Sequence, residues 1–113
     1  MVAFKRSPCP IASALDILGD RWSLVVVRDL LFRDRHTYGE LLDAPEGIST
    51  NILAERLRRL EGAGIIAKEA YQTRPRRYRY RLTEKGEALR PVLVSMVRWA
   101  NMHIPGTARP PVT

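Results

Sequence analysis

The stretch STNILAERLR, which begins at Ser49, combines residue types that proteins use to read base pairs. Asn51 can form two hydrogen bonds with adenine, and the hydroxyls of Ser49 and Thr50 suit phosphate oxygens. Ala54 leaves space for close approach and can touch a thymine methyl, and Arg58 follows one helical turn later. Helical spacing brings these side chains to one face, opposite a stripe of leucines. The pattern predicts a helix that enters a DNA groove, although a plain solvated helix face would show the same residues.

A dense group of arginines follows. The stretch from Gln72 to Leu82 contains no acid and five arginines: Arg74, Arg76, Arg77, Arg79 and Arg81. Crowded like charges repel one another, so an ordinary hairpin mixes its charges. An uncompensated set implies a partner that supplies negative charge, as a phosphate backbone or a narrow minor groove does. We therefore expect the stretch to grip DNA through Arg74, Pro75, Arg76, Arg77 and Arg79.

Cys9 is the third candidate functional feature, because its thiol can react. It directly precedes Pro10, where a helix is predicted to start, and Lys5 and Arg6 are close in sequence. A helix N-terminus and nearby cations favour thiolate over thiol, which makes the sulfur reactive. Cys9 is therefore a candidate redox sensor, and the alternative is a partly buried cysteine that acts as a small hydrophobe. With one cysteine in the sequence, oxidation can give an intersubunit disulfide, a mixed disulfide with a small thiol, or a sulfenic acid.

Apolar residues recur at helical spacing in the first half of the chain, in residues 11–18, 21–32, 40–44 and 50–63. Pro10 fits the first turn of the first helix, and Gly19 ends it. Asp20 can cap the second helix, which we expect to be largely enclosed by its neighbours, and Ser49 can cap the fourth. A short helix, a turn with glycine and a capped amphipathic helix make a helix-turn-helix.

After Gly64 the pattern changes from helical to alternating. Residues 65–71 have strand character, residues 72–77 read as a polar loop with proline, and residues 78–82 alternate strictly. The alternation places the tyrosines and the leucine on one side and the arginines on the other. We predict a hairpin with one packed face and one cationic face.

A last helix is expected after the hairpin. Thr83 can cap it, Pro91 kinks or restarts it, and it runs to about Met102. Its apolar residues exceed what one small core needs. The candidates for a dimer interface are Val92, Met96 and Trp99.

The expected fold class is mainly α with a small β-hairpin (α+β), a winged helix-turn-helix. The chain of 113 residues is the length of one domain. Residues 9–102 are expected to form the DNA-binding and dimerisation domain. A flexible basic arm over residues 1–8 precedes it, and a disordered, proline-rich tail over residues 103–113 follows.

The charge of the chain favours a polyanionic partner. Nineteen Lys and Arg residues against twelve Asp and Glu residues give a formal charge of +7, and the pI is about 10.3. Nucleic acid and an anionic membrane surface both fit this balance. A membrane role is disfavoured because the apolar face of the hairpin is needed to cover the core. Without a secretory segment, a long apolar run or a disulfide framework, we expect a cytoplasmic protein.

Other chemistry is not indicated. His36 and His103 lack the spacing of metal ligands, and no carboxylates accompany them at such a spacing. The sequence also has no glycine-rich phosphate loop. The aspartates of the early helices, Asp16, Asp20 and Asp29, read as caps and solvated positions. Trp22 is expected in the core. We expect no metal, no cofactor and no enzymatic activity.

Several separated segments resemble the HxlR family of bacterial winged-helix regulators, relatives of the MarR type. They are CPIASALDILGDRWSLVVVRDLL, YGELL, GISTNILAERLRRLEGAGII and YQTRPRRYRYRLTEKG. The resemblance covers about residues 9–102 and implies a homodimeric transcription factor whose terminal helices form the dimer interface. It also supports Cys9 as a sensor, because a cysteine at this place senses oxidants or electrophiles in some members.

Carried over by position, the resemblance assigns the groove-facing role to Ser49, Thr50, Asn51 and Arg58, and the wing tip to Pro75 and Arg77. The chain departs from the family pattern at two places. Thr37 stands where a basic residue usually precedes the aromatic, which removes one phosphate contact. Arg79 stands where many members have an acid, and it implies a wing with lower selectivity and a steeper salt dependence.

These features predict a sequence-specific, double-stranded DNA-binding transcriptional regulator, with repression favoured over activation. A homodimer would bind a pseudo-palindromic operator with half-sites about one helical turn apart. An oxidant at Cys9, or a small molecule near the dimer interface, would change the spacing of the two recognition helices. The alternative is a winged-helix module that binds RNA or docks proteins and has no sensing role.

Overall fold

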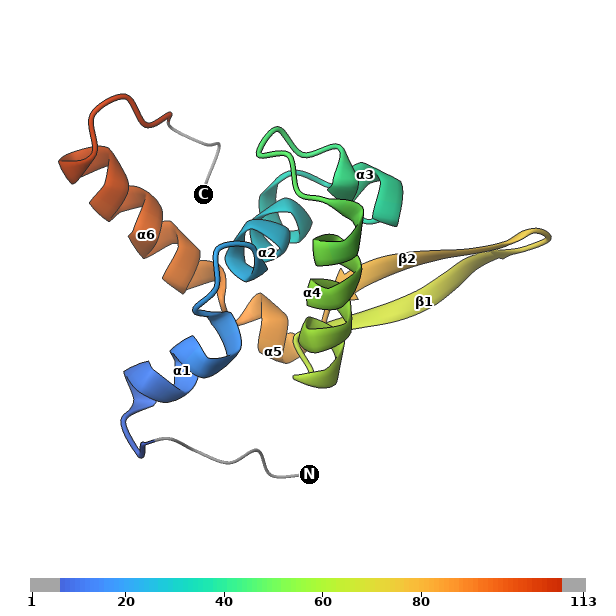
Figure 1. Ribbon diagram of the computed structural model, residues 1–113, viewed down its shortest axis with the longest axis horizontal. Coiled ribbons are helices and arrows are strands. Elements are labelled where there is room, and N and C mark those ends of the chain that lie inside the picture. Colours follow the sequence, from blue (N-terminus) through green and yellow to red (C-terminus); the bar gives the residue numbers. More distant parts are fainter. Residues whose placement is uncertain (1–6, 109–113) are drawn as a thin grey trace.

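The computed structural model describes residues 7–108, and these fold into helices and one antiparallel hairpin (Figure 1). The elements in chain order are α1 (Pro10–Leu18), α2 (Ser23–Phe32), α3 (Tyr38–Leu42), α4 (Thr50–Gly62), β1 (Ile66–Thr73), β2 (Arg76–Leu82), α5 (Glu84–Glu87) and α6 (Arg90–His103). The predicted order and fold class are confirmed. Most of the predicted arm, residues 1–6, and the end of the predicted tail, residues 109–113, lie outside the described residues.

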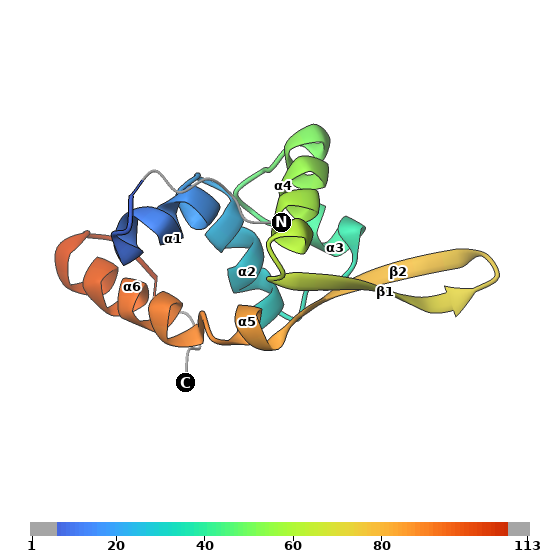
Figure 2. The same ribbon diagram turned by 90° about the horizontal axis from the view of Figure 1, so that it is seen from below.

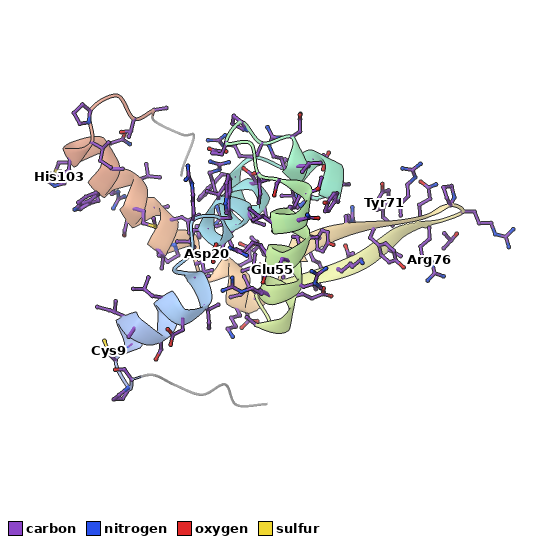
Figure 3. The ribbon with its side chains drawn as sticks, viewed as in Figure 1. Cys9, Asp20, Glu55, Tyr71, Arg76 and His103 are labelled. Atoms are coloured by element: carbon purple, nitrogen blue, oxygen red, sulfur yellow. The ribbon has the colours of Figure 1, made fainter. Side chains whose placement is uncertain are left out.

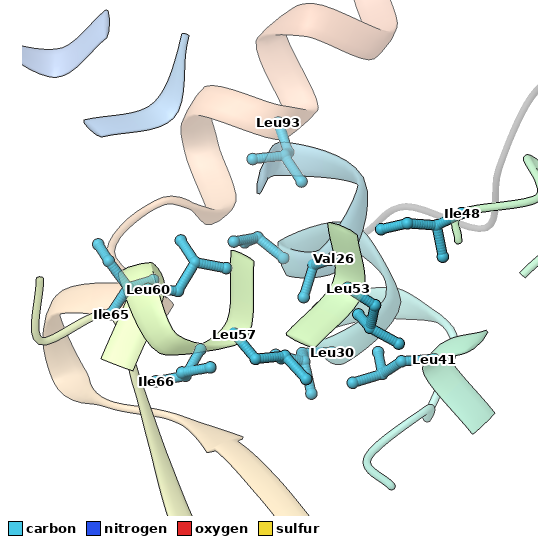
Figure 4. Packing of buried hydrophobic residues seen from close by; sticks show 11 residues of the cluster. Val26, Leu30, Leu41, Ile48, Leu53, Leu57, Leu60, Ile65, Ile66 and Leu93 are labelled. Atoms are coloured by element: carbon cyan, nitrogen blue, oxygen red, sulfur yellow. The ribbon is translucent and has the colours of Figure 1, made fainter. Parts of the chain in front are cut away.

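The core lies between α2, α4 and the start of the hairpin (Figure 4). The leucine stripe of α4, Leu53, Leu57 and Leu60, is completely enclosed. It packs with Val26 and Val27 of α2, and Leu93 of α6 closes the cluster from the other side. Burying each of these side chains stabilises the fold by about 1.5–3 kcal/mol. The apolar stripe therefore fixes which face of α4 points outward.

The ends of α4 follow the sequence signals. The Ser49 hydroxyl accepts a hydrogen bond from the Ile52 amide (3.3 Å) as an N-cap. After the helix, Gly64 has a φ of 78°, a left-handed conformation that favours glycine. Tyr38 of α3 donates its hydroxyl to the Thr50 carbonyl (2.9 Å). The beginning of α4 is thus tied to the preceding short helix.

The prediction for Asp29 was wrong. This carboxylate is not a solvated position but 1% exposed, on the inner side of α2. Arg28 donates two hydrogen bonds to one Asp29 oxygen (3.0 and 2.7 Å), and it also binds both oxygens of Glu46 before α4 (2.5 and 2.9 Å). Because a buried charge is costly without a partner, the pairing explains how α2 tolerates it.

The hairpin is longer than predicted. Residues 72–77, expected to be a loop, are mostly strand, and the turn is confined to Arg74 and Pro75. A bulge lies between Ala70 and Gln72, where β1 carries one more residue than β2. At its base, the Tyr80 amide donates to the His36 carbonyl (2.7 Å). The hairpin is therefore anchored to the α2–α3 connection and extends away from the body.

The terminal helices lie at the end of the molecule opposite the hairpin (Figures 1 and 2). Helix α1 contributes no buried residue. The last helix restarts at Pro91 as predicted, giving a short α5 and a long α6. Helix α6 ends at His103, close to its predicted end at about Met102.

Candidate nucleic-acid interface

The predicted reading face lies at the exposed start of α4. Ser49, Thr50, Asn51 and Arg58 are exposed, and Ala54 is half-buried between them. Neither Asn51 nor Arg58 enters a salt bridge or side-chain hydrogen bond within residues 7–108. The polar groups of these two side chains are therefore available to a partner. Because the leucine stripe holds the opposite side, they must face away from the core.

The hairpin presents a cationic tip. Arg74, Pro75, Arg76 and Arg77 are exposed at and around the turn, where Figure 3 shows Arg76 far from the body. None of these arginines forms a salt bridge in the described part of the chain. The tip therefore carries three guanidinium groups without a carboxylate partner, which we call unpaired; Arg76 also hydrogen-bonds to Tyr78.

The premise that all five arginines lack a counter-ion was wrong. Glu69 of β1 accepts hydrogen bonds from Arg79 (3.0 Å) and Arg81 (3.2 Å) of β2. The hydrogen bonds from Arg79 and then Arg81 hold the pKa of Glu69 below its usual range. Glu69 lies opposite Arg79 in the strand register, outside the stretch of residues in which acids were counted. Arg79, predicted to grip DNA, is exposed but already has a partner.

The packed face of the hairpin is also shorter than predicted. Tyr80 and Leu82 pack against the core, whereas Tyr78 is exposed and the Lys68 ammonium group lies 4.5 Å from the centroid of its ring. Tyr71, at the bulge, is exposed as well (Figure 3). It lines a polar depression together with Arg79. Sequence reasoning missed Tyr71 as a surface residue of the hairpin. The position of the bulge, which no short-range pattern specifies, decides this placement.

Cys9 is exposed at the start of α1 in the single chain. Its amide donates to the Ser7 hydroxyl (3.1 Å), and its carbonyl accepts from Ser13 in the first helical turn (2.9 Å). Lys5 and Arg6, which were expected to favour the thiolate, lie outside the described residues. What the geometry supplies is an accessible sulfur at a helix N-terminus.

Helix α6 carries a large exposed apolar face. Val92, Met96 and Trp99, the predicted dimer residues, are 44%, 51% and 61% exposed. They line a shallow depression of about 750 Å³ together with Pro91 and Ile104. A monomer rarely exposes a contiguous apolar surface of this kind. Trp22, by contrast, packs against the core as predicted.

Other sites are not found within residues 7–108. No cluster of His, Cys, Asp and Glu there could hold a metal ion. His36 pairs with Asp34 (2.8 Å), and the His103 ring lies 5.2 Å from the Trp99 ring. No helix in this part of the chain is long and apolar enough to cross a membrane.

A family model described as HxlR-like helix-turn-helix matches residues 17–108, which include α3, α4 and the hairpin. The chain belongs to this family. The HxlR resemblance predicted from separated motifs is thereby confirmed. The predicted winged helix-turn-helix fold is also confirmed, because regulators of known structure share it.

The HTH-type transcriptional regulator sll1512 of Synechocystis sp. is 46% identical over 88 residues, covering 78% of this chain and 64% of the relative. The chain thus spans just under two thirds of that protein. The reduced form of the regulator YodB from B. subtilis is 33% identical with a TM-score of 0.72, covering 90% of this chain and all of that one. The redox regulator HypR in its oxidised form is 28% identical with a TM-score of 0.75, covering 84% and 97%.

Proposed function

We propose that the chain is a DNA-binding transcriptional regulator that acts as a homodimer. The observation that carries this is the exposed, unpaired polar start of α4, combined with three unpaired arginines at the hairpin tip in a member of the HxlR-like family. In a helix-turn-helix, the first residues of the second helix contact base edges. Asn51 then reads bases, and Arg74, Arg76 and Arg77 grip phosphates or a minor groove.

Fluorescence anisotropy with the DNA upstream of the chain's own gene tests DNA reading. A scrambled duplex and a structured RNA of equal length serve as competitors at fixed salt. We expect the native duplex to bind about a hundredfold or more tighter than the scrambled one. Equal affinity for both duplexes, or preference for the RNA, refutes the proposal. A promoter–reporter assay then distinguishes repression, which we expect, from activation.

The exposed apolar face of α6 supports the dimer. Large exposed apolar patches mark association surfaces, and α1 adds exposed Ile11 and Leu15 at the same end of the molecule. Trp99→Lys should give a folded monomer in sedimentation experiments, because its side chain supports little of the monomer core. Tyr71→Lys, an equally conspicuous exposed aromatic on the hairpin, should leave the dimer intact. A native chain that sediments as a monomer contradicts this proposal.

We also propose that Cys9 senses oxidants. The support is its exposed sulfur at the start of α1, together with the similarity to a protein described as the redox regulator HypR. Diamide should change the DNA affinity of the native protein and leave Cys9→Ser unaffected. An equal response of the two proteins excludes Cys9 as the sensor.

A further inference from the structure

Four charged side chains form a closed ring where the α1–α2 turn meets α4. Asp20 accepts a hydrogen bond from Arg56 (2.9 Å), and Arg56 in turn donates to Glu55. The other oxygen of Glu55 lies 3.8 Å from Arg59 Nε, and Arg59 returns to the second oxygen of Asp20, also at 3.8 Å. We call this set the charge ring. Figure 3 labels Asp20 and Glu55, its two acids.

Asp20 also caps α2. It accepts hydrogen bonds from the amides of Trp22 (2.8 Å) and Ser23 (2.9 Å) and from the Ser23 hydroxyl (2.5 Å). Its side chain is only 18% exposed. Burial alone raises the pKa of Asp20, but the hydrogen bonds from Ser23, Trp22 and Arg56 together hold it well below its usual range. The carboxylate is therefore ionised at any physiological pH, and its position is fixed from both sides.

The location of the charge ring gives it a role beyond packing. Helix α1 has no fully buried residue, and Leu18 at its end is its one side chain that packs against the core. The turn at Gly19 and Asp20, which directly follows Leu18, therefore helps to set the direction of α1 relative to the body (Figure 1). The charge ring connects this same turn to the middle and second half of α4, where Glu55, Arg56 and Arg59 lie. Arg56 and Arg59 thereby join a helix proposed to form the dimer to the helix proposed to read DNA.

We propose that Asp20 is a positioning residue of DNA recognition: through the charge ring it fixes the angle between α1 and α4, and so the separation of the two recognition helices in the dimer. This inference rests on the proposed function, because the separation has meaning only in a DNA-binding dimer. Half-site spacing in such dimers follows from the distance between recognition helices. A loosened charge ring should therefore allow incorrectly spaced operators to bind.

The charge ring has no net charge, which allows a sharp test. Asp20→Asn removes a negative charge but keeps a side-chain oxygen that can accept from the amides of Trp22 and Ser23. Arg56→Gln removes a positive charge and leaves the hydrogen bonds between Asp20 and the start of α2 in place. The two changes alter nonspecific DNA attraction in opposite directions, so an effect that they share cannot come from net charge.

Affinity is measured by anisotropy for the natural operator and for duplexes with one base pair inserted or removed between the half-sites. We expect both variants to lower the preference for the natural spacing by about three- to tenfold, the effect of a coupling typical of contacting charges. For an isolated half-site, the affinity of each variant should change only through its net charge: Asp20→Asn should bind more tightly and Arg56→Gln more weakly than the native protein. The double variant should lose no more preference than a single one, because both changes open the same ring.

Matched controls come from the exposed pair of Glu87 and Arg90, which lie 3.3 Å apart beyond the hairpin. Glu87→Gln and Arg90→Gln repeat the two charge changes outside the charge ring and should leave the spacing preference unchanged. Thermal unfolding shows which variants are folded. If Asp20→Asn does not fold, Glu55→Gln opens the ring instead and likewise removes a negative charge.

Unchanged spacing preference in the ring variants, or equal loss in the controls, overturns the inference. So does a native protein that reads sequence but tolerates every spacing. If the native protein shows no sequence preference at all, the proposed function fails first, and this outcome is distinguishable because isolated half-sites then bind no better than scrambled DNA.

Discussion

Arg77→Ala removes one unpaired cation per protomer from the hairpin tip. The logarithm of DNA affinity falls with the logarithm of salt concentration, with a slope of about −0.9 for each phosphate contact. A dimer should therefore lose about 1.8 of this slope. Three unpaired arginines per protomer contribute about −5.4 in all, whereas five would contribute about −9. The pairing of Glu69 with Arg79 and Arg81 thus changes the expected salt dependence by a measurable amount.

The matched control is Arg81→Ala, a change of the same kind on the same strand. Arg81 lies 3.2 Å from Glu69, so its charge is already balanced and the slope should change little. Glu69→Gln does the reverse: it frees Arg79 and Arg81 and should steepen the slope by up to about 3.6 in a dimer. The assay is an anisotropy titration at several salt concentrations between about 50 and 200 mM, the range in which the effect is large.

Equal slopes for Arg77→Ala and Arg81→Ala would refute this reasoning, because paired and unpaired arginines would then contribute alike. A steepening in Glu69→Gln that persists when Arg79 and Arg81 are both replaced would also refute it. Circular dichroism of each variant confirms that the hairpin change has not unfolded the domain.

Three further predictions concern reading, packing and acid stability. Asn51→Ala should relax specificity at one base pair by about 1–3 kcal/mol with little change in the salt slope, as measured on a set of single-base operator variants. Gly86→Ala should destabilise the fold by about 1–3 kcal/mol, because a Cβ there would lie 2.2 Å from the Ile65 carbonyl oxygen. Gly62→Ala, where a Cβ meets no atom within 4 Å, should be neutral or stabilising. The unfolding free energies of both variants are measured by denaturant titration. The hydrogen bonds from Arg28 lower the pKa of Glu46 from 4.5 to about 2, so its stabilising contribution is complete above about pH 4.5 and is lost as the pH falls toward 2. The difference in unfolding free energy between the native protein and Glu46→Gln should therefore shrink across that range, and a constant difference would contradict the assignment.

The helix-turn-helix could be predicted because its signals are local. Ser49 as cap, Gly64 as stop and the leucine stripe between them are read within a few residues, and each has the predicted place in the structure. Helix α1 was equally readable from Pro10 and Gly19. Such elements depend on short-range hydrogen bonding and periodicity.

Charge pairing could not be predicted because it depends on contacts between distant residues. Glu69 meets Arg79 only through the register of the hairpin, and Asp20 meets Arg56 only once α4 is packed against α2. Asp29 was misplaced for the same reason: its burial follows from the direction in which α2 faces the core. A count of charges along the sequence therefore overestimates the free charge of this surface.

The bulge between Ala70 and Gln72 divides the hairpin into two parts with separate tasks. Below it, Tyr80 and Leu82 are held by the core and by His36. Above it, residues 72–77 contribute no residue to the core cluster. We therefore expect that the distal part can be exchanged between relatives at little cost in folding free energy. Substitutions there would change the proposed contacts of the tip with DNA and leave the proposed reading helix unchanged.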